Sequence, residues 1–358
     1  MKIIERLVKM FTPKDEMTPR ERMEAFSKGE AYDRVPCCPF TGESYANHFG
    51  YGLDEYNHSQ AIIIDVIKKT FDMFEPDNCS IGPGLHGMPE AMGAELSFFK
   101  NDIPRIKTPR LKTYDEIDAL EIVDPYKDGR LNIYIEALKE MQALVGHKVC
   151  VGNTIGGPFT TAAMLVGTER FLKDLIKQKE SIHKLLKITT ESTLRFMDAV
   201  MDLGIQPGMA DPIASSHLIS PRIYREFVFP YTKICQDHIK KRMGSGGVLH
   251  ICGKTKPIWD DMVATGIGGL SLDNQDDIGE LRSKHEGTVT VIGNVDPVSV
   301  MKYGKKEDIY EAVKVCCDKA LGSRSGFVLA TGCDIPIGTP PENVKHMLDA
   351  ARIYGNMR

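Results

Sequence analysis

Two residue types that bind metal ions lie two positions apart in this chain. His250 and Cys252 fall at the end of an apolar run that extends from Gly247 to Gly253. Positions i and i+2 of a strand face the same side, so the imidazole and the thiol would share a face. Cys333 ends a second apolar run much later in the chain, and a distant strand end could add this second thiol. The three residues predict a Cys2His zinc site, and three protein ligands with an open fourth position are typical of catalytic zinc.

The alternative is that these three residues are ordinary buried side chains, since free cysteine is often found in protein cores. A His-x-Cys pair alone would be weak evidence for a metal. Here Gly253 follows Cys252 and Gly332 precedes Cys333, so both thiols are placed at glycine-flanked turns. Zinc is the expected metal because two thiolates and an imidazole suit a borderline-soft ion.

The ligand charges indicate the chemistry that such a site would favour. Zn²⁺ with two thiolates and a neutral imidazole is formally neutral. A thiol that enters the open position would lose its proton and keep useful nucleophilicity near neutral pH. The predicted ligand set therefore favours alkylation of a thiol over activation of water.

Two aspartates follow other apolar runs and are candidates for the same site. Asp273 could bind the metal at rest and be displaced by substrate; the alternatives are a helix N-cap or a polar barrel residue. Asp211 could bind substrate or act as an acid or base, whereas its alternative role is to cap the following turn. Further candidates for substrate binding are Asn153, Ser215 and Asn294.

The elements that must position these residues alternate along the chain. Eight short apolar runs predict strands, at 35–40, 78–82, 148–152, 206–211, 247–252, 268–273, 288–294 and 327–332. Between them, apolar residues recur at helical spacing, most clearly over 182–201 and 309–320. Strands that alternate with helices imply a parallel sheet, and eight of them suggest an α/β fold of the (β/α)8 TIM-barrel type. In such a barrel the chemistry lies at the carboxyl ends of the strands, where the candidate residues are found.

The remaining segments fit one domain over residues 1–358 with an N-terminal helical extension at 1–30. Residues 1–11 are amphipathic at helical spacing, which predicts a docked helix, with a membrane-surface helix as the alternative. The segment 101–129, with three prolines, is predicted to be irregular and to cover one end of the barrel.

Composition excludes several classes of protein. The 358 residues are 42% hydrophobic and 26% charged with a net charge of -4, which gives no basic footprint for nucleic acid. No apolar stretch is long enough to span a membrane. Nine cysteines in this length are too few for a disulfide scaffold, and with no signal peptide they indicate a cytoplasmic protein. The oligomeric state, monomer or homodimer, is left open.

Several segments resemble the zinc-containing coenzyme M methyltransferases of the uroporphyrinogen decarboxylase superfamily. The two most specific segments are 249–253, LHICG, and 331–336, TGCDIP; the others are 339–343, 210–215, 219–221, 90–95 and 291–295. The resemblance begins near Thr18 and covers most of the chain. It implies a (β/α)8 barrel in which His250, Cys252 and Cys333 hold Zn²⁺. It also implies a methyl-transfer reaction, in which a partner corrinoid protein supplies the methyl group as methylcobamide and a small thiol such as coenzyme M accepts it.

The same superfamily leaves three alternatives. Some members pass methyl from a methylated amine, thiol or aryl ether to a corrinoid protein. Others are porphyrinogen decarboxylases, which recognise a polyacid with an arginine-bearing segment; here residues 35–45 hold no arginine, and Glu43 would repel a polyacid. The third alternative is a non-enzymatic partner of a corrinoid protein with a structural zinc.

Overall fold

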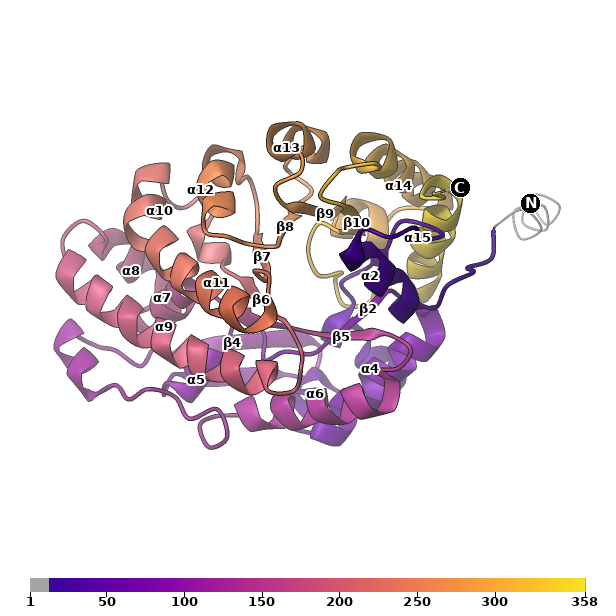
Figure 1. Ribbon diagram of the computed structural model, residues 1–358. Coiled ribbons are helices and arrows are strands. Elements are labelled where there is room, and N and C mark those ends of the chain that lie inside the picture. Colours follow the sequence, from indigo (N-terminus) through magenta and orange to yellow (C-terminus); the bar gives the residue numbers. More distant parts are fainter. Residues whose placement is uncertain (1–12, 358) are drawn as a thin grey trace.

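Eight short parallel strands form the centre of the computed structural model, which describes residues 13–357 (Figure 1). The strands are β1 (Cys37–Cys38), β2 (Asn78–Ser80), β5 (Cys150–Gly156), β6 (Pro207–Ala210), β7 (Val248–Ile251), β8 (Gly269–Leu272), β9 (Thr290–Val295) and β10 (Phe327–Thr331). Each overlaps one of the runs from which a strand is predicted, although β5 continues four residues beyond its run and β9 one residue beyond its own. Their order, β1-β10-β9-β8-β7-β6-β5-β2, is that of a (β/α)8 barrel that is nearly closed.

Asp77 joins the two strands at the ends of this order. Its backbone N–H donates to the Cys37 carbonyl at 3.1 Å, and its carboxylate accepts from the Cys37 N–H at 2.6 Å. The same carboxylate accepts from Arg22 and, at 2.6 Å, from Arg34. The barrel seam is therefore closed by a buried aspartate with two arginine partners.

Helices surround the strands, as Figure 1 shows. They are α2 (Pro19–Lys28), α3 (Leu53–Tyr56), α4 (Gln60–Phe74), α5 (Gly87–Ala91), α6 (Leu131–Val145), α7 (Pro158–Val166), α8 (Thr168–Asp174), α9 (Lys179–Met201), α10 (Pro221–Phe227), α11 (Phe229–Met243), α12 (Trp259–Ala264), α13 (Ile278–His285), α14 (Lys306–Ala320) and α15 (Pro341–Tyr354). The helices predicted over 182–201 and 309–320 are confirmed as α9 and α14. Within residues 13–357, no helix combines the length and the apolar character needed to cross a membrane.

Helix α2 lies across the amino-terminal end of the barrel. Thr18 starts it with a capping box to Glu21, and Pro19 is at its first position, so its start is encoded locally. Its Arg20 N–H donates to the carbonyl of Lys148, just before β5, at 2.8 Å. Phe26 packs against a cluster of buried residues from β1, β9 and β10. The amphipathic residues 1–11 lie outside the described part of the chain.

The segment after β2 corrects one expectation. Residues 101–129 were predicted to be irregular, but β4 (Asp102–Thr108) pairs antiparallel with β3 (Glu95–Phe99), and a short helix, η3 (Tyr114–Ala119), follows. Proline did not prevent strand formation here. Pro104 lies in a strand with a single partner, where a missing backbone N–H is tolerated. The hairpin packs on α3, whose Leu53 N–H donates to the Lys100 carbonyl.

Strand alternation divides the barrel interior into two unlike halves. On the side of β1, β9 and β10 the interior positions are apolar and buried, with Cys38, Ile292, Val328 and Ala330 in one cluster. On the side of β2, β5 and β6 the interior positions are small or polar. They are Asn78, Ser80, Gly152, Thr154, Gly208 and Ala210. The interior thus carries mainly larger apolar side chains on one side and small or polar residues on the other.

Candidate metal centre

The structure brings the three predicted ligands together. Nε2 of His250 lies 3.3 Å from Sγ of Cys252, and Sγ of Cys252 lies 3.9 Å from Sγ of Cys333. The ligand atoms of all three residues lie within 4.8 Å of one another. His250 belongs to β7, Cys252 follows that strand, and Cys333 follows β10, so all three lie at carboxyl ends of strands. Among residues 13–357, this is the one group of three or more such side chains close enough to share a metal ion.

The spacing matches a tetrahedral zinc site. Bonds of about 2.3 Å to sulfur and about 2.0 Å to nitrogen place two sulfurs ~3.8 Å apart and a nitrogen ~3.5 Å from a sulfur. The observed separations are 3.9 Å and 3.3 Å. The donor atoms present therefore fit zinc without a change of strand position.

Ser271 of the neighbouring strand β8 orients His250. Nδ1 of the imidazole lies 3.2 Å from the Ser271 carbonyl oxygen and 3.1 Å from its hydroxyl. A carbonyl can only accept, so Nδ1 carries the proton and Nε2 is left with a free lone pair toward the thiols. The sequence argument missed Ser271, although a serine inside the apolar run of β8 was the available signal.

The two thiols of the cluster differ in the direction of their pKa shifts. Hydrogen bonding between them lowers the pKa of Cys252, and the same contact together with burial raises the pKa of Cys333. Burial alone would lower the pKa of His250, but it is raised because the neighbouring Cys333 thiol favours the protonated ring. In this pair the proton is therefore lost more easily from Cys252 than from Cys333.

Asp273 and Asn294 lie beside the metal centre, and their side chains form hydrogen bonds with the backbone of neighbouring loops. One carboxylate oxygen of Asp273 accepts from the Gly253 N–H at 2.8 Å, and the other accepts from the Gln275 N–H at 3.0 Å. Asn294 donates its amide hydrogens to the carbonyls of Asp273 and Asp276. Asp273 fixes the turn after Cys252 and is outside the three-residue cluster. Its role as a displaceable ligand stays a prediction, as does substrate binding by Asn294.

Asp211 ends β6 next to His250 and is buried, with 1% of its surface exposed. Its N–H donates to the His250 carbonyl at 2.9 Å. One carboxylate oxygen accepts from the Thr160 N–H at 2.7 Å and from the Thr160 hydroxyl, so Asp211 binds the first turn of α7. The other oxygen has no hydrogen-bond partner among the described residues. Burial raises the pKa of Asp211 to about 6, although its bonds to Thr160 act in the opposite direction.

Asn153 and Ser215 occupy positions that the sequence alone did not resolve. Strand β5 continues to Gly156, so Asn153 lies within it, is buried, and donates to the Ile81 carbonyl at 2.8 Å. Its neighbour Thr154 takes the interior position. Ser215 is buried against Gly253, where an added Cβ would come within 3.1 Å of its hydroxyl. Substrate binding by Asn153 and Ser215 stays a prediction.

Two acidic residues from loops far apart in the sequence lie near the metal centre, and their proximity could not be predicted from the sequence. Asp334 follows Cys333, and its charge acts on the His250 ring. Glu43, in the short helix η1 (Gly42–Tyr45) after β1, accepts from the Asn57 amide at 3.0 Å. Burial raises the pKa of Glu43, and Asp334 raises it further by repulsion. Burial also raises the pKa of the Asp334 carboxyl, so the surroundings of both groups favour the neutral acid over the anion.

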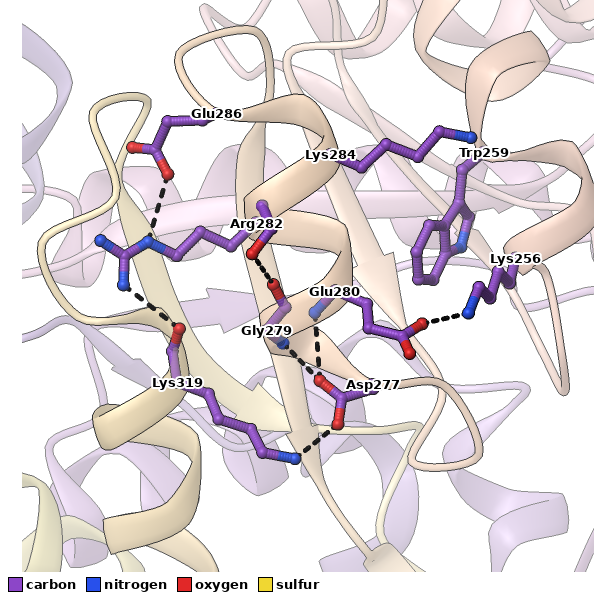
Figure 2. A pocket seen from close by; sticks show the side chains of 10 residues that line it. Lys256, Trp259, Asp277, Gly279, Glu280, Arg282, Lys284, Glu286 and Lys319 are labelled. Carbon is purple, nitrogen blue, oxygen red and sulfur yellow. Dashed lines mark hydrogen bonds and ion pairs between the residues drawn. The ribbon is translucent and has the colours of Figure 1, made fainter.

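A separate surface cleft lies in the helical layer outside the barrel (Figure 2). It has a volume of about 860 Å³ and is lined by residues near α12, α13 and α14. Its charged side chains pair with one another, Asp277 with Lys319 at 2.6 Å and Glu286 with Arg282 at 3.2 Å. None of the predicted site residues lines this cleft, so the chemistry is placed at the His250 cluster instead.

Comparisons with known proteins show the family of the chain and several relatives along its length. The family model described as uroporphyrinogen decarboxylase (URO-D) matches residues 18–354. The methylcobamide:CoM methyltransferase MtbA of Methanosarcina acetivorans is 27% identical over 95% of this chain and 99% of its own length. The uroporphyrinogen decarboxylase of Nitrosomonas europaea is 26% identical over 84% of this chain and 89% of its own. A solved methyltransferase structure from Methanosarcina mazei superposes with a TM-score of 0.84 at 27% identity, covering 95% of this chain and 99% of that one.

Proposed function

The chain belongs to the uroporphyrinogen decarboxylase (URO-D) family, and we propose that it is a zinc-dependent methyltransferase that moves a methyl group between a corrinoid protein and a small thiol. The observation that carries this proposal is the convergence of one imidazole nitrogen and two thiols at the carboxyl ends of β7 and β10. Similarity to methylcobamide:CoM methyltransferases over nearly the whole chain supports the choice of reaction.

Each residue of the cluster has a defined part in this function. His250, Cys252 and Cys333 would hold zinc, which when bound lowers the pKa of a thiol in its open position. Ser271 keeps Nε2 of His250 available by accepting a hydrogen bond from Nδ1–H. The two cysteines contribute two negative charges, which keep electron density on a bound thiolate and so preserve its reactivity toward a methyl group.

Zinc content and methyl transfer are the direct tests. We expect one zinc ion per chain in the wild type and a strong reduction in Cys252→Ser. Cys317→Ser serves as a matched control, because Cys317 is a buried thiol on α14 outside the cluster. Free methylcobalamin offered with a panel of thiols, followed by absorbance, should show demethylation with at least one of them. A wild-type protein that binds no stoichiometric metal would refute the proposal.

The direction of transfer is a finer question within the same proposal. A relative that is 24% identical over 74% of this chain is named a methylated-thiol–coenzyme M methyltransferase, which suggests that methylated donors also belong in the panel. Incubation of the zinc-loaded protein with reduced cobalamin and methylated thiols would detect the reverse transfer through the appearance of methylcobalamin.

Decarboxylation of a porphyrinogen is the second candidate function, because some relatives carry that name. Residues 35–45 contain no arginine and carry the acidic residue Glu43, so this segment offers no positive charge to a substrate with many carboxylates. Turnover of a tetra-acetate porphyrinogen by metal-free protein would favour this function over methyl transfer.

The zinc could also act only as a structural clip in a non-enzymatic partner protein. Under that alternative, His250→Ala would lose much of its fold, because a structural metal contributes folding free energy. A stable variant without methyl transfer would favour the enzyme instead.

A further inference from the structure

The two sulfurs of the metal centre are close enough to be joined to each other. Sγ of Cys252 lies 3.9 Å from Sγ of Cys333, whereas the sulfurs of a disulfide are about 2.0 Å apart. Each sulfur would have to move by only about 1 Å, a shift of the size that rotation about the Cα–Cβ bond produces. The spacing that suits a shared zinc ion is therefore also a short step from a covalent bond between its ligands.

The backbone holds the two sulfurs together without the help of a metal. The turn after Cys252 is fixed by the N–H of Gly253, which donates to Oδ2 of Asp273 at 2.8 Å. The residue before Cys333, Gly332, donates its N–H to a carbonyl at the end of β9 at 2.8 Å. Both anchors are made by the protein itself, so we expect the pair to remain in place when zinc is removed.

Solvent reaches both thiols of this pair. Six of the nine cysteines are buried, and the three of intermediate exposure are Cys150, Cys252 and Cys333. Within residues 13–357, Cys252 and Cys333 are the one pair of cysteines joined by a hydrogen bond between their sulfurs. Cys150 begins β5 and so lies at the opposite end of the strands. A small oxidant in solution can therefore reach two thiols that already face each other.

A zinc ion and a disulfide exclude each other at this site. Zinc binds cysteine as the thiolate, and the sulfurs of a disulfide carry no such charge. Oxidation would remove two of the three predicted ligands and leave His250 alone. Conversely, bound zinc would occupy both sulfurs and protect them from oxidation.

We propose that Cys252 and Cys333 form a redox switch: in the zinc-free protein a peroxide converts them to an intramolecular disulfide, which blocks the return of zinc. The inference concerns the regulation of the same site, and it rests on the proposed function to the extent that methyl transfer needs the bound zinc. It assigns the two sulfurs a second chemistry, in which they are oxidised instead of binding a metal ion.

The oxidation takes place in two steps. Hydrogen peroxide first converts one thiol to a sulfenic acid; the O–O bond breaks, one oxygen forms the new S–O bond, and the other leaves as water with the thiol hydrogen. The second thiol then attacks the sulfur of the sulfenic acid, the S–O bond breaks, and a second water leaves as the S–S bond forms. Two electrons pass from the sulfurs to the peroxide. Dithiothreitol reverses the reaction by thiol–disulfide exchange and is itself oxidised to a cyclic disulfide.

The test treats the full-length protein with an equimolar amount of hydrogen peroxide, once after zinc loading and once after removal of zinc by a chelator. Peptide mapping by mass spectrometry without reduction should find the peptides of Cys252 and Cys333 linked in the zinc-free sample and separate in the zinc-loaded sample. Chelator competition should show that oxidation lowers the affinity for zinc by more than about 100-fold, beyond the effect of losing a group that only orients a ligand. Dithiothreitol should restore the affinity.

Cys150→Ser is the matched control, because Cys150 is also half-buried but lies at the other end of the barrel. This variant should still form the linked peptides, whereas Cys252→Ser should form none. Circular dichroism should show that removal of zinc leaves the fold intact, and loss of the fold would contradict the proposal because the pair would not be held in place.

Two further outcomes separate this inference from the proposed function. Absence of the linked peptides from the oxidised zinc-free protein, or an unchanged affinity for zinc after oxidation, would overturn the switch while leaving the proposed function intact. A reduced protein that binds no zinc and transfers no methyl group would instead refute the proposed function, and the peptide map would still decide whether the disulfide forms.

Discussion

The imidazole of His250 presents Nε2 to the two thiols because Ser271 holds Nδ1 in its protonated form. The contact joins neighbouring strands, since His250 pairs in register with Ser271. Groups that orient a metal ligand in this way also raise its basicity. At the scale of single residues, the affinity of the site for zinc therefore depends on a serine that donates no ligand atom.

Ser271→Ala should lower the affinity for zinc by about tenfold, at the lower end of the range for such partners, because the backbone carbonyl of residue 271 still accepts from Nδ1. Competition with a fluorescent chelator would measure the change. Ser283→Ala is the control, because the Ser283 hydroxyl bonds only to the Gly279 carbonyl on exposed α13. An unchanged zinc affinity in Ser271→Ala would contradict this role.

At the scale of elements, Asp211 connects the end of β6 to the start of α7. Its carboxylate binds Thr160, and Gly157 comes so close that an added Cβ would lie 2.3 Å from Oδ2. This close approach explains why a glycine, Gly157, precedes α7. Among the described residues, Oδ2 is buried and has no hydrogen-bond partner. A buried oxygen of this kind favours the protonated carboxyl, which is why the pKa of Asp211 is raised to about 6.

This raised pKa predicts a dependence of stability on pH. Between the ordinary value of 3.8 and about 6 the folded protein holds a proton on Asp211 that the unfolded chain has released, so the free energy of unfolding falls as pH rises through this window. Asp211→Asn removes the contribution, which is at most about 3 kcal/mol. Urea unfolding of both proteins from pH 4 to pH 7 measures this effect. The free energy of unfolding of the variant should increase relative to that of the wild type as pH rises. Parallel pH profiles would show that Asp211 does not carry the proton.

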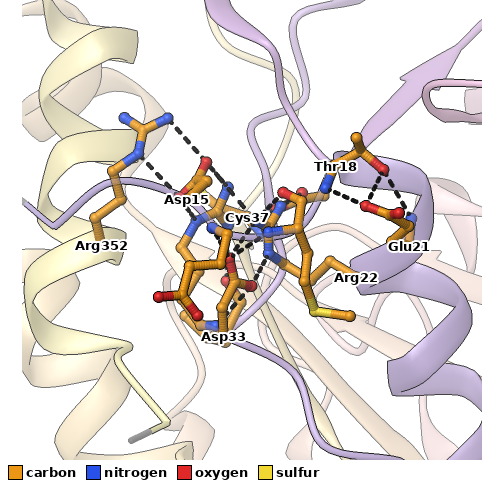
Figure 3. Close-up of polar contacts among 12 residues, drawn as sticks. Asp15, Thr18, Glu21, Arg22, Asp33, Cys37 and Arg352 are labelled. Atoms are coloured by element: carbon orange, nitrogen blue, oxygen red, sulfur yellow. Dashed lines mark hydrogen bonds and ion pairs between the residues drawn. The ribbon is translucent and has the colours of Figure 1, made fainter.

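At the scale of the whole molecule, a buried ion network holds the barrel seam (Figure 3). Asp77 binds Arg22 of α2 and Arg34 before β1, Arg22 also binds Asp33, and Asp15 joins Arg34 to Arg352 of α15. The network thus links both ends of the described chain to the point where the first and second strands of the barrel meet. Its residues lie at the amino-terminal end of the strands, away from the metal centre.

Asp77→Asn should lower the free energy of unfolding by about 3–5 kcal/mol, because it removes one charge from a buried set and leaves arginines unpaired. Asp72→Asn, which breaks an exposed pair with Lys68, should change it by less than ~1 kcal/mol. Denaturant unfolding compares the two, and zinc binding to folded Asp77→Asn should be retained. Equal effects of the two substitutions would contradict a special role of the seam.

Local patterns in the sequence predicted the strands, from which the (β/α)8 order follows, and identified the three candidate ligands, because alternation within a strand and helical periodicity are properties of neighbouring residues. His250 and Cys252 could be placed on one face from their spacing alone. The tertiary structure decided whatever depends on strand register and loop packing. Register sets Ser271 beside His250, and the length of β5 turns Thr154 rather than Asn153 into the barrel. Loop packing brings Glu43 near Asp334 and turns the Asp211 carboxylate onto α7. These contacts join residues far apart in the chain, and no periodicity of the sequence records them.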